Sequence, residues 1–226
     1  MHSALACRGK KLVNADNGNI GKMIKEKNTV IWVDIENPNE KDKKLLSETF
    51  GFHPLAIDDC AHFTHIPKVD DFGKYIFIVF HKILFDKKTK TFKLVELDIF
   101  LGKNYIVTVH GGTSPEIDTV KKKIMESCAP LSLGPPLVLH ALLEYNTFQY
   151  FPLLEHLDKS IEELEEKILS GKTKNAMREI TKLKKQVYSL KRSFLPQRDV
   201  INGFQEENLW LFLNRQTYTS GTYMTT

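Results

Sequence analysis

The chain has 226 residues, of which 32 are lysine or arginine and 28 are aspartate or glutamate, so its formal net charge is +4. That length allows a buried core in one or two domains, and so small a charge does not require a nucleic-acid partner. The apolar runs are far shorter than the ~20 residues of a membrane-spanning helix, and residues 1–14 lack the apolar region of a signal peptide.

The ordered part of the chain is predicted to begin with a strand and a helix. Residues 1–28 are polar without a repeating pattern, so we expect them to be irregular. Residues 29–35 (TVIWVDI) are rich in β-branched and aromatic side chains, which is typical of a buried strand. A helix follows, with Asn37 as its N-cap, Pro38 at its first position and Gly51 at its end.

Three further strands are predicted in the middle of the chain. Residues 74–85 (KYIFIVFHKILF) form an apolar run that suits a central strand better than a helix. Residues 92–101 and 105–110 follow a polar loop, with Gly102 supplying the turn between them, so the three segments are expected to form an antiparallel set. Ser114 then opens another helix.

The pattern changes at about residue 135. Apolar residues recur at helical spacing in two stripes, over residues 153–168 and 177–194. They predict two antiparallel helices joined by a polar turn at residues 170–172, each about 40–50 Å long at a rise of about 1.5 Å per residue. Pro152 and Pro196 are expected to kink or interrupt these helices.

These elements indicate an α+β protein. A mixed, largely antiparallel sheet with helices packed on it is expected over residues 1–134, and a long antiparallel helical hairpin over residues 135–226. Acidic side chains crowd the first long helix and basic side chains crowd the second. We interpret them as two solvated faces that attract each other weakly, at ~0–1 kcal/mol per pair. The alternative is that the basic face contacts nucleic acid.

Two adjacent carboxylates are the strongest local signal for a site. Asp58 and Asp59 follow a short apolar run, and Lys68 follows within a Pro-Lys-Val unit. Adjacent acids repel each other unless a cation or a basic side chain lies close by, and a helix cap or an ion pair with Lys68 is the ordinary interpretation. Hydrolytic catalysis by the pair is an alternative, but no nucleophile elbow, P-loop or HExxH motif accompanies it.

The cysteines and histidines offer another interpretation. Cys60, His62 and His65 are ligands of the type that zinc prefers, although three donors on one loop need a distant fourth. The three cysteines, which include Cys7 and Cys128, are far apart and odd in number. This pattern favours a reducing compartment over a disulfide framework.

Six segments, taken together, resemble a known family. They are residues 32–38, 50–59 (FGFHPLAIDD), 67–69 (PKV), 75–79 (YIFIV), 150–155 (YFPLLE) and 190–200 (LKRSFLPQRDV). In order and spacing they are similar to the N-terminal cytosolic domain of the CorA-type magnesium and cobalt transporters, over residues 29–203.

The resemblance implies a fold, an assembly and a site. The fold is an α/β/α sandwich followed by two long helices, without enzymatic activity. The assembly is a homopentameric channel in the cell membrane, in which this domain lies on the cytoplasmic side, makes no contact with nucleic acid and precedes a stalk and two spans that the printed sequence lacks. Mg²⁺, for which Co²⁺ or another divalent cation can substitute, binds between subunits and keeps the pore closed.

The resemblance also implies which residues are metal ligands. Asp59 corresponds to a carboxylate that faces a stalk acid of the neighbouring subunit. Asp58 lies beside a second, weaker site, to which Glu144 contributes. Two other functions stay open: a zinc-transporting relative in the same superfamily, and a soluble adaptor that uses its helical hairpin to contact protein or nucleic acid.

Overall fold

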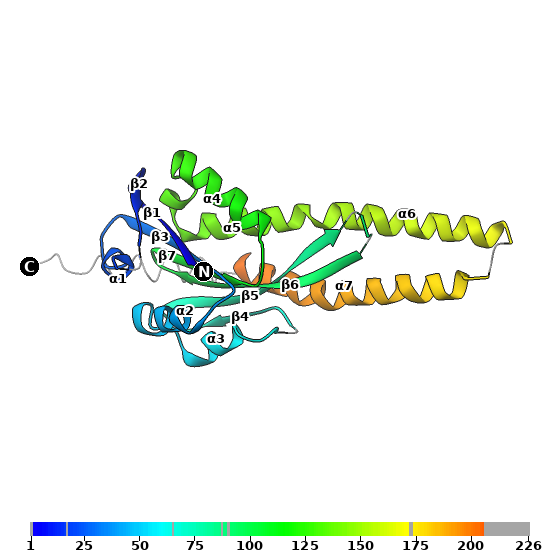
Figure 1. The fold of residues 1–226 in the computed structure, drawn as a ribbon, viewed down its shortest axis with the longest axis horizontal. Helices are drawn as coiled ribbons and strands as arrows, with labels where there is room; N and C mark the ends of the chain where they lie inside the picture. Colours follow the sequence, from blue (N-terminus) through cyan, green and yellow to red (C-terminus); the bar gives the residue numbers. More distant parts are fainter. Residues whose placement is uncertain are drawn as a thin grey trace, which may run out of the picture.

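A mixed sheet lies at the centre of the molecule (Figure 1). The computed structural model describes residues 2–205 apart from residues 17, 65, 87, 90, 172 and 173, with side chains as far as residue 202. The sheet has seven strands in the order β2-β1-β3-β7-β6-β5-β4, and β3 and β7 pair in parallel while the other neighbours pair antiparallel. The strands are β1 (His2–Arg8), β2 (Lys11–Asn14), β3 (Thr29–Glu36), β4 (Lys68–Asp71), β5 (Tyr75–Asp86), β6 (Thr91–Gly102) and β7 (Tyr105–His110).

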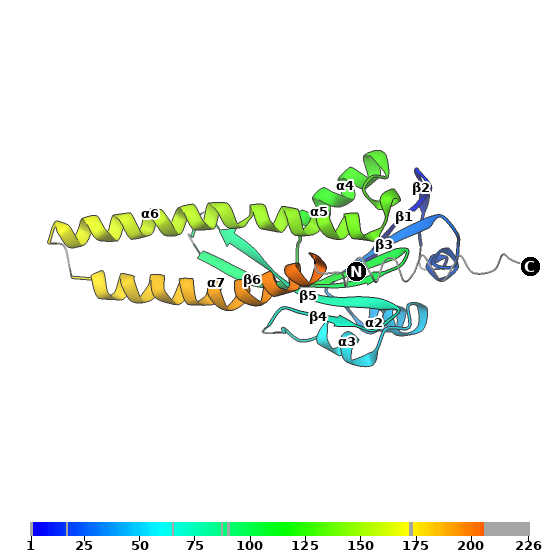
Figure 2. The ribbon, with the colours of Figure 1, turned by 180° about the vertical axis from the view of Figure 1, so that it is seen from behind.

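Helices cover both faces of this sheet, and two more extend beyond it (Figures 1 and 2). The helices are α1 (Ile20–Met23), α2 (Glu40–Lys44), the π-helical turn η1 (Leu45–Thr49), α3 (Pro54–Asp59), α4 (Pro115–Ser127), the 3₁₀ turn η2 (Leu131–Leu133), α5 (Pro135–Phe148), α6 (Tyr150–Leu169) and α7 (Ala176–Gln205). Helices α4 and α5 lie on one face, and α2 and α3 lie on the other. The predicted sandwich with a mixed, largely antiparallel sheet is therefore confirmed.

Each face of the sheet has its own hydrophobic core. Successive side chains of a strand point to opposite faces, and on β6 the buried Ile99 belongs to the core under α4 and α5 whereas Phe100 belongs to the core under α2 and α3. Ile117 and Leu142 complete the first core, and Ile57 completes the second. Burial of each such side chain contributes roughly 1.5–3 kcal/mol, so the two cores hold the layers together.

The N-terminal segment differs from expectation, because residues 1–28 are not irregular. Strand β1 pairs with β3 along its whole length and with β2 in a hairpin. Its buried residues, Ala6 and Cys7, are small and have little intrinsic preference for strands. The strand therefore forms through its long-range pairing with β3, which local sequence patterns do not reveal.

The predicted N-cap at Asn37 is also wrong. Asn37 adopts a left-handed conformation with φ of 48°, and its side-chain oxygen accepts a hydrogen bond from Gly112 N at 3.0 Å. The cap is Asn39, whose side chain accepts from Asp42 N while Asp42 accepts from the backbone of Asn39. Both asparagines have an acid three residues later, Glu40 and Asp42, so the sequence pattern of a capping box does not distinguish them. The left-handed backbone of Asn37 and its contact with Gly112 N decide in favour of Asn39.

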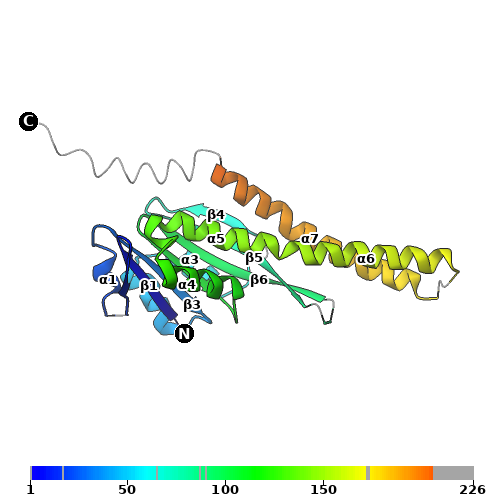
Figure 3. The same ribbon diagram turned by 90° about the horizontal axis from the view of Figure 1, so that it is seen from above.

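The long hairpin of α6 and α7 projects past the end of the sheet (Figure 3). With 20 and 30 residues, the helices are about 30 and 45 Å long, so the first is shorter than predicted. Pro152 lies in the first turn of α6, where its missing N–H is tolerated, and the chain breaks just before it at Gln149. Helix α7 continues through Pro196. At its base the hairpin packs on the sheet through Leu157, Leu190 and neighbouring apolar side chains.

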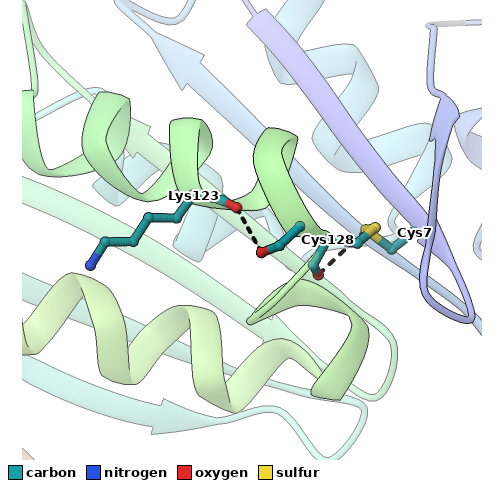
Figure 4. Close-up of a disulfide and its surroundings, with 4 residues drawn as sticks. Cys7, Lys123 and Cys128 are labelled. Atoms are coloured by element: carbon teal, nitrogen blue, oxygen red, sulfur yellow. Dashed lines mark hydrogen bonds between the residues drawn. A yellow bond between two sulfur atoms is a disulfide. The ribbon is translucent and has the colours of Figure 1, made fainter.

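One disulfide joins the N-terminal strand to the far end of α4 (Figure 4). Cys7 and Cys128 are separated by 121 residues, yet their Cα atoms lie 6.1 Å apart. The interpretation that the cysteines stay unpaired is therefore wrong for these two, whereas Cys60 is a free thiol. The fold, rather than the spacing, brings the pair together.

Candidate metal centre

Helix α3 presents the two predicted carboxylates at its C-terminal end. The His53 ring accepts a hydrogen bond from Leu55 N at 3.2 Å and so caps the helix, and Pro54 occupies the first helical position. Ala56 and Ile57 are buried against the sheet. Because Ala56 and Ile57 face the sheet, the Asp58 side chain points to solvent and the Asp59 side chain is only partly exposed.

The two carboxylates differ in their surroundings. The side chain of Asp58 is 73% exposed, and Nδ1 of the His62 ring lies 3.9 Å from its Oδ1. The side chain of Asp59 is 33% exposed and accepts a hydrogen bond from Lys68 Nζ at 2.7 Å through Oδ2. The predicted ion pair between Asp59 and Lys68 is therefore confirmed.

Lys68 is shared between two acids. Its ammonium group also lies 2.8 Å from Asp70 Oδ2. Partial burial works to lower the pKa of Lys68, but the hydrogen bonds with Asp59 and Asp70 outweigh it and raise that pKa above its ordinary value. The lysine is consequently a fixed positive charge beside Asp59, and it neutralises part of the negative charge that a cation would otherwise meet.

A second acidic pair lies under α3, and the sequence analysis missed it. Burial raises the pKa of Glu96 to about 7, although Thr64 N donates a hydrogen bond to its carboxylate. Burial and the charge of Glu96 raise the pKa of Asp98 well above its ordinary value, and Asp98 Oδ1 has no hydrogen-bond partner among the described residues. Both side chains line a cleft of about 530 Å³ together with Cys60. The signal in the sequence is two acids at alternate positions of an otherwise apolar strand.

The zinc interpretation finds little support in these contacts. The Cys60 thiol lies 3.2 Å from Ala56 O, and burial followed by the charge of Asp98 raises its pKa well above the ordinary value, which disfavours the thiolate that binds zinc. His62 is exposed and contacts Asp58, and His65 lies outside the described residues. Within the described part of the chain, no three His, Cys, Asp or Glu side chains are placed to hold a metal ion.

Glu144 lies apart from the acidic pair of α3. It is exposed on α5, which covers the opposite face of the sheet (Figure 1). One subunit therefore does not bring Glu144 together with Asp58 and Asp59. A site that uses all three would need parts of more than one subunit.

The donor atoms themselves fit a weakly bound hard cation. Both oxygens of Asp58 and Oδ1 of Asp59 are free of the Lys68 contact, and carboxylate oxygens are what Mg²⁺ prefers. Mg²⁺ keeps several waters and typically takes one or two carboxylates, so an exposed pair suffices without a closed cage. The site is suited to a hydrated divalent ion at a surface.

The fold and this surface define a class: a sandwich domain with a projecting helical hairpin and exposed carboxylates suited to a hydrated cation. A family model described as "CorA-like Mg2+ transporter protein" matches residues 27–221. The chain therefore belongs to the CorA-like Mg²⁺ transporter family, which confirms the resemblance. The family is one of transporters, in agreement with the prediction that the chain is not an enzyme.

Individual relatives agree with this assignment. YfjQ of Bacillus subtilis (strain 168) is 31% identical over 170 residues, which cover 75% of this chain and 52% of that protein. The cobalt/magnesium transport protein CorA of Thermotoga maritima is 25% identical over 185 residues, covering 81% of this chain and 53% of that protein. The chain thus spans about half the length of these relatives.

Solved structures share the fold. The soluble domain of CorA from Methanocaldococcus jannaschii superposes with a TM-score of 0.70 at 20% identity, covering 98% of this chain and 92% of that one. The cytoplasmic domain of ZntB from Vibrio parahaemolyticus gives a TM-score of 0.62 at 15% identity, covering 78% of this chain and 71% of that one. Among the helices described here, α1 to α7, none combines the length and apolar character needed to cross a membrane.

Proposed function

We propose that this chain is the cytoplasmic, magnesium-sensing part of a homopentameric channel for Mg²⁺ or Co²⁺ in the cell membrane. The observation that carries the proposal is the pair of acids at the end of α3, where Asp58 is largely exposed and Asp59 is partly exposed and paired with Lys68. Family membership supports transport of a metal ion, and the pair provides the ligands for a regulatory one.

The physical basis of sensing is repulsion between subunits. Asp59 would meet an acid of the neighbouring subunit's stalk, and Asp58 and Glu144 would contribute to a second, weaker site across the same boundary. With a hydrated cation between them, these acids attract the ion and hold the subunits together. Without it, like charges face each other and the ring loosens.

Weak binding is an advantage in such a sensor. A millimolar dissociation constant corresponds to only ~4 kcal/mol, so the site empties when cytosolic magnesium falls. A coupling of ~1–3 kcal/mol per site is typical of allostery, and its repetition around a ring biases a concerted opening. This bias requires that the cation bind the closed arrangement better than the open one.

The test uses the full-length protein encoded by the natural gene. Asp59→Asn is expected to raise the magnesium concentration for half-maximal closure several-fold, since a coupling of about 1 kcal/mol or more per site is lost. Magnesium should also protect the wild type, but not this variant, from proteolysis. Asp118→Asn, which changes an exposed acid of α4, is the matched control and should respond like the wild type. An unchanged response of Asp59→Asn would refute the proposal.

A further inference from the structure

The edge of strand β5 is completed by side chains of the long helices instead of by a strand. Strand β4 pairs with β5 only as far as Val79, so the outward-facing backbone groups of His81 lie beyond its end. Gln197 Oε1 of α7 accepts a hydrogen bond from His81 N at 2.6 Å, and Tyr150 of α6 donates its hydroxyl to His81 O at 3.4 Å. These two side chains therefore take the place of the missing strand.

The same two side chains also contact each other. Gln197 Nε2 donates to the Tyr150 hydroxyl at 2.9 Å. Burial raises the pKa of Tyr150 to about 12, so the phenol keeps the proton that it donates to His81 O. Gln197 and His81 are 3% and 1% exposed. Because water does not reach these groups, breaking any one of the hydrogen bonds leaves a buried polar group without a partner. Tyr150, Gln197 and the backbone of His81 therefore stabilise one another's positions.

The ring of His81 contacts the segment that follows Asp59. Its Nε2 lies 2.7 Å from Thr64 O, and since a carbonyl can only accept, Nε2 carries the proton and donates it. Phe63 stacks on the ring with centroids 5.1 Å apart. Thr64 N donates in turn to Glu96. Thr64 is thus held by His81 and Glu96, and Asp59, five residues before it, is held by its ion pair with Lys68.

The other ring nitrogen of His81 faces α7. Its Nδ1 lies 3.3 Å from Ser193 Oγ, within hydrogen-bonding distance. Ser193 is 2% exposed. One imidazole consequently joins the Thr64 segment on one side to the buried face of α7 on the other, where that helix lies against β4 and β5 (Figure 2).

We infer that His81 couples the cation site to α7. The inference rests on the proposed sensing function and adds a positioning residue to it. A shift of Asp59 and Lys68 on binding or losing a cation moves the segment around Thr64, and His81 transmits this shift to Ser193 and Gln197. In return, a displaced α7 changes the position of Asp59. This link lies within one subunit and is distinct from the repulsion between subunits.

The first test measures backbone hydrogen exchange in the 226-residue chain without magnesium. Gln197→Leu and His81→Phe are compared with Arg198→Leu, which changes the next residue of α7 to the same apolar side chain at an exposed position. Gln197→Leu should raise the exchange rate of the Thr64 amide roughly ten-fold, as expected for loss of one buried hydrogen-bond partner, although Gln197 does not touch Thr64. Arg198→Leu should leave it unchanged.

Two outcomes of this experiment would overturn the inference. One is an unchanged exchange rate at residues 61–67 in both Gln197→Leu and His81→Phe. The other is a uniform increase over all strands, which would mean that the contacts support the fold in general and do not link these two parts.

The second test separates the inference from the proposed function. In the full-length protein, His81→Phe and Gln197→Leu should shift the magnesium concentration for half-maximal closure by several-fold, whereas Arg198→Leu should not. If the wild type closes in magnesium and both variants close at the same concentration, the inference fails while the sensing function stands. If the wild type does not respond to magnesium, the proposed function fails and the regulatory role of His81 fails with it.

Discussion

Replacing Glu96 by glutamine should change how the stability of the domain depends on pH. In the native protein, burial raises the pKa of Glu96 from its ordinary value of 4.5 to about 7. Below pH 4.5 the folded and unfolded states are both protonated, and Glu96 has no effect on the free energy of unfolding. Between about 4.5 and 7 only the folded state keeps its proton, so stability decreases as the pH rises.

The size of this effect follows from the shift. At about 1.4 kcal/mol per pKa unit, the difference between 4.5 and about 7 sets an upper bound of about 3.5 kcal/mol. Glu96 is only half-buried, and solvent screening reduces the effect to roughly 1–2 kcal/mol. Glutamine keeps an oxygen that accepts from Thr64 N and carries no charge. The variant should therefore match the wild type near pH 4.5 and exceed its stability by roughly 1–2 kcal/mol at pH 8.

Urea denaturation at pH 4.5, 6, 7 and 8 measures this difference directly. Asp98 must be considered as well, because the charge of Glu96 contributes to its raised pKa. Removing that charge lowers the pKa of Asp98, which adds to the gain in stability at high pH. Glu126→Gln, at an exposed position of α4, is the control. Parallel curves for wild type and Glu96→Gln across the pH range would show that the carboxyl is not buried as described.

Three further predictions concern stability. Glu116→Gln leaves the fully buried Lys82 without the carboxylate that lies 2.7 Å from it, and urea denaturation should show that the free energy of unfolding falls by about 3–5 kcal/mol. The double variant Lys82→Met, Glu116→Leu removes both charges, and an equal fall in that variant would contradict this explanation. Reducing the bond between Cys7 and Cys128 should lower the free energy of unfolding by about 4–5 kcal/mol because it closes a loop of 121 residues, and a thermal midpoint unaffected by dithiothreitol would argue against it. Asn39→Ala removes the capping box of α2 and should cost about 1 kcal/mol of stability, and calorimetry that finds no such loss would contradict this.

The strands that form the middle of the sheet were predictable from the sequence. Residues 29–36, 75–86 and 105–110 are apolar and rich in β-branched and aromatic side chains, and turn residues separate them. What local patterns do not contain is which strands become neighbours. The parallel pairing of β3 with β7 and the edge position of β1 depend on contacts between distant parts of the chain, and β1 has too few large apolar residues to predict a strand.

The candidate site was predictable only in part. Asp58 and Asp59 are adjacent in sequence, so their repulsion and the need for Lys68 could be inferred without a structure. Glu96 and Asp98 lie on strand β6, almost 40 residues further along the chain, and come beneath α3 only in the fold. Sequence spacing likewise cannot show that His81, a residue inside an apolar strand, contacts both the Thr64 segment and α7.

The buried acids change how the charge of this surface should be counted. Two pairs of carboxylates lie near the end of α3: Asp58 and Asp59 on the helix itself, and Glu96 and Asp98 in the cleft beneath it. Burial raises the pKa of Glu96 to about 7 and the pKa of Asp98 well above its ordinary value, so this second pair carries less negative charge at neutral pH than two ordinary carboxylates would. Most of the negative charge at this surface is then that of Asp58, Asp59 and Asp70, part of which Lys68 neutralises. This small net charge suits the weak cation binding that the proposed sensing function requires.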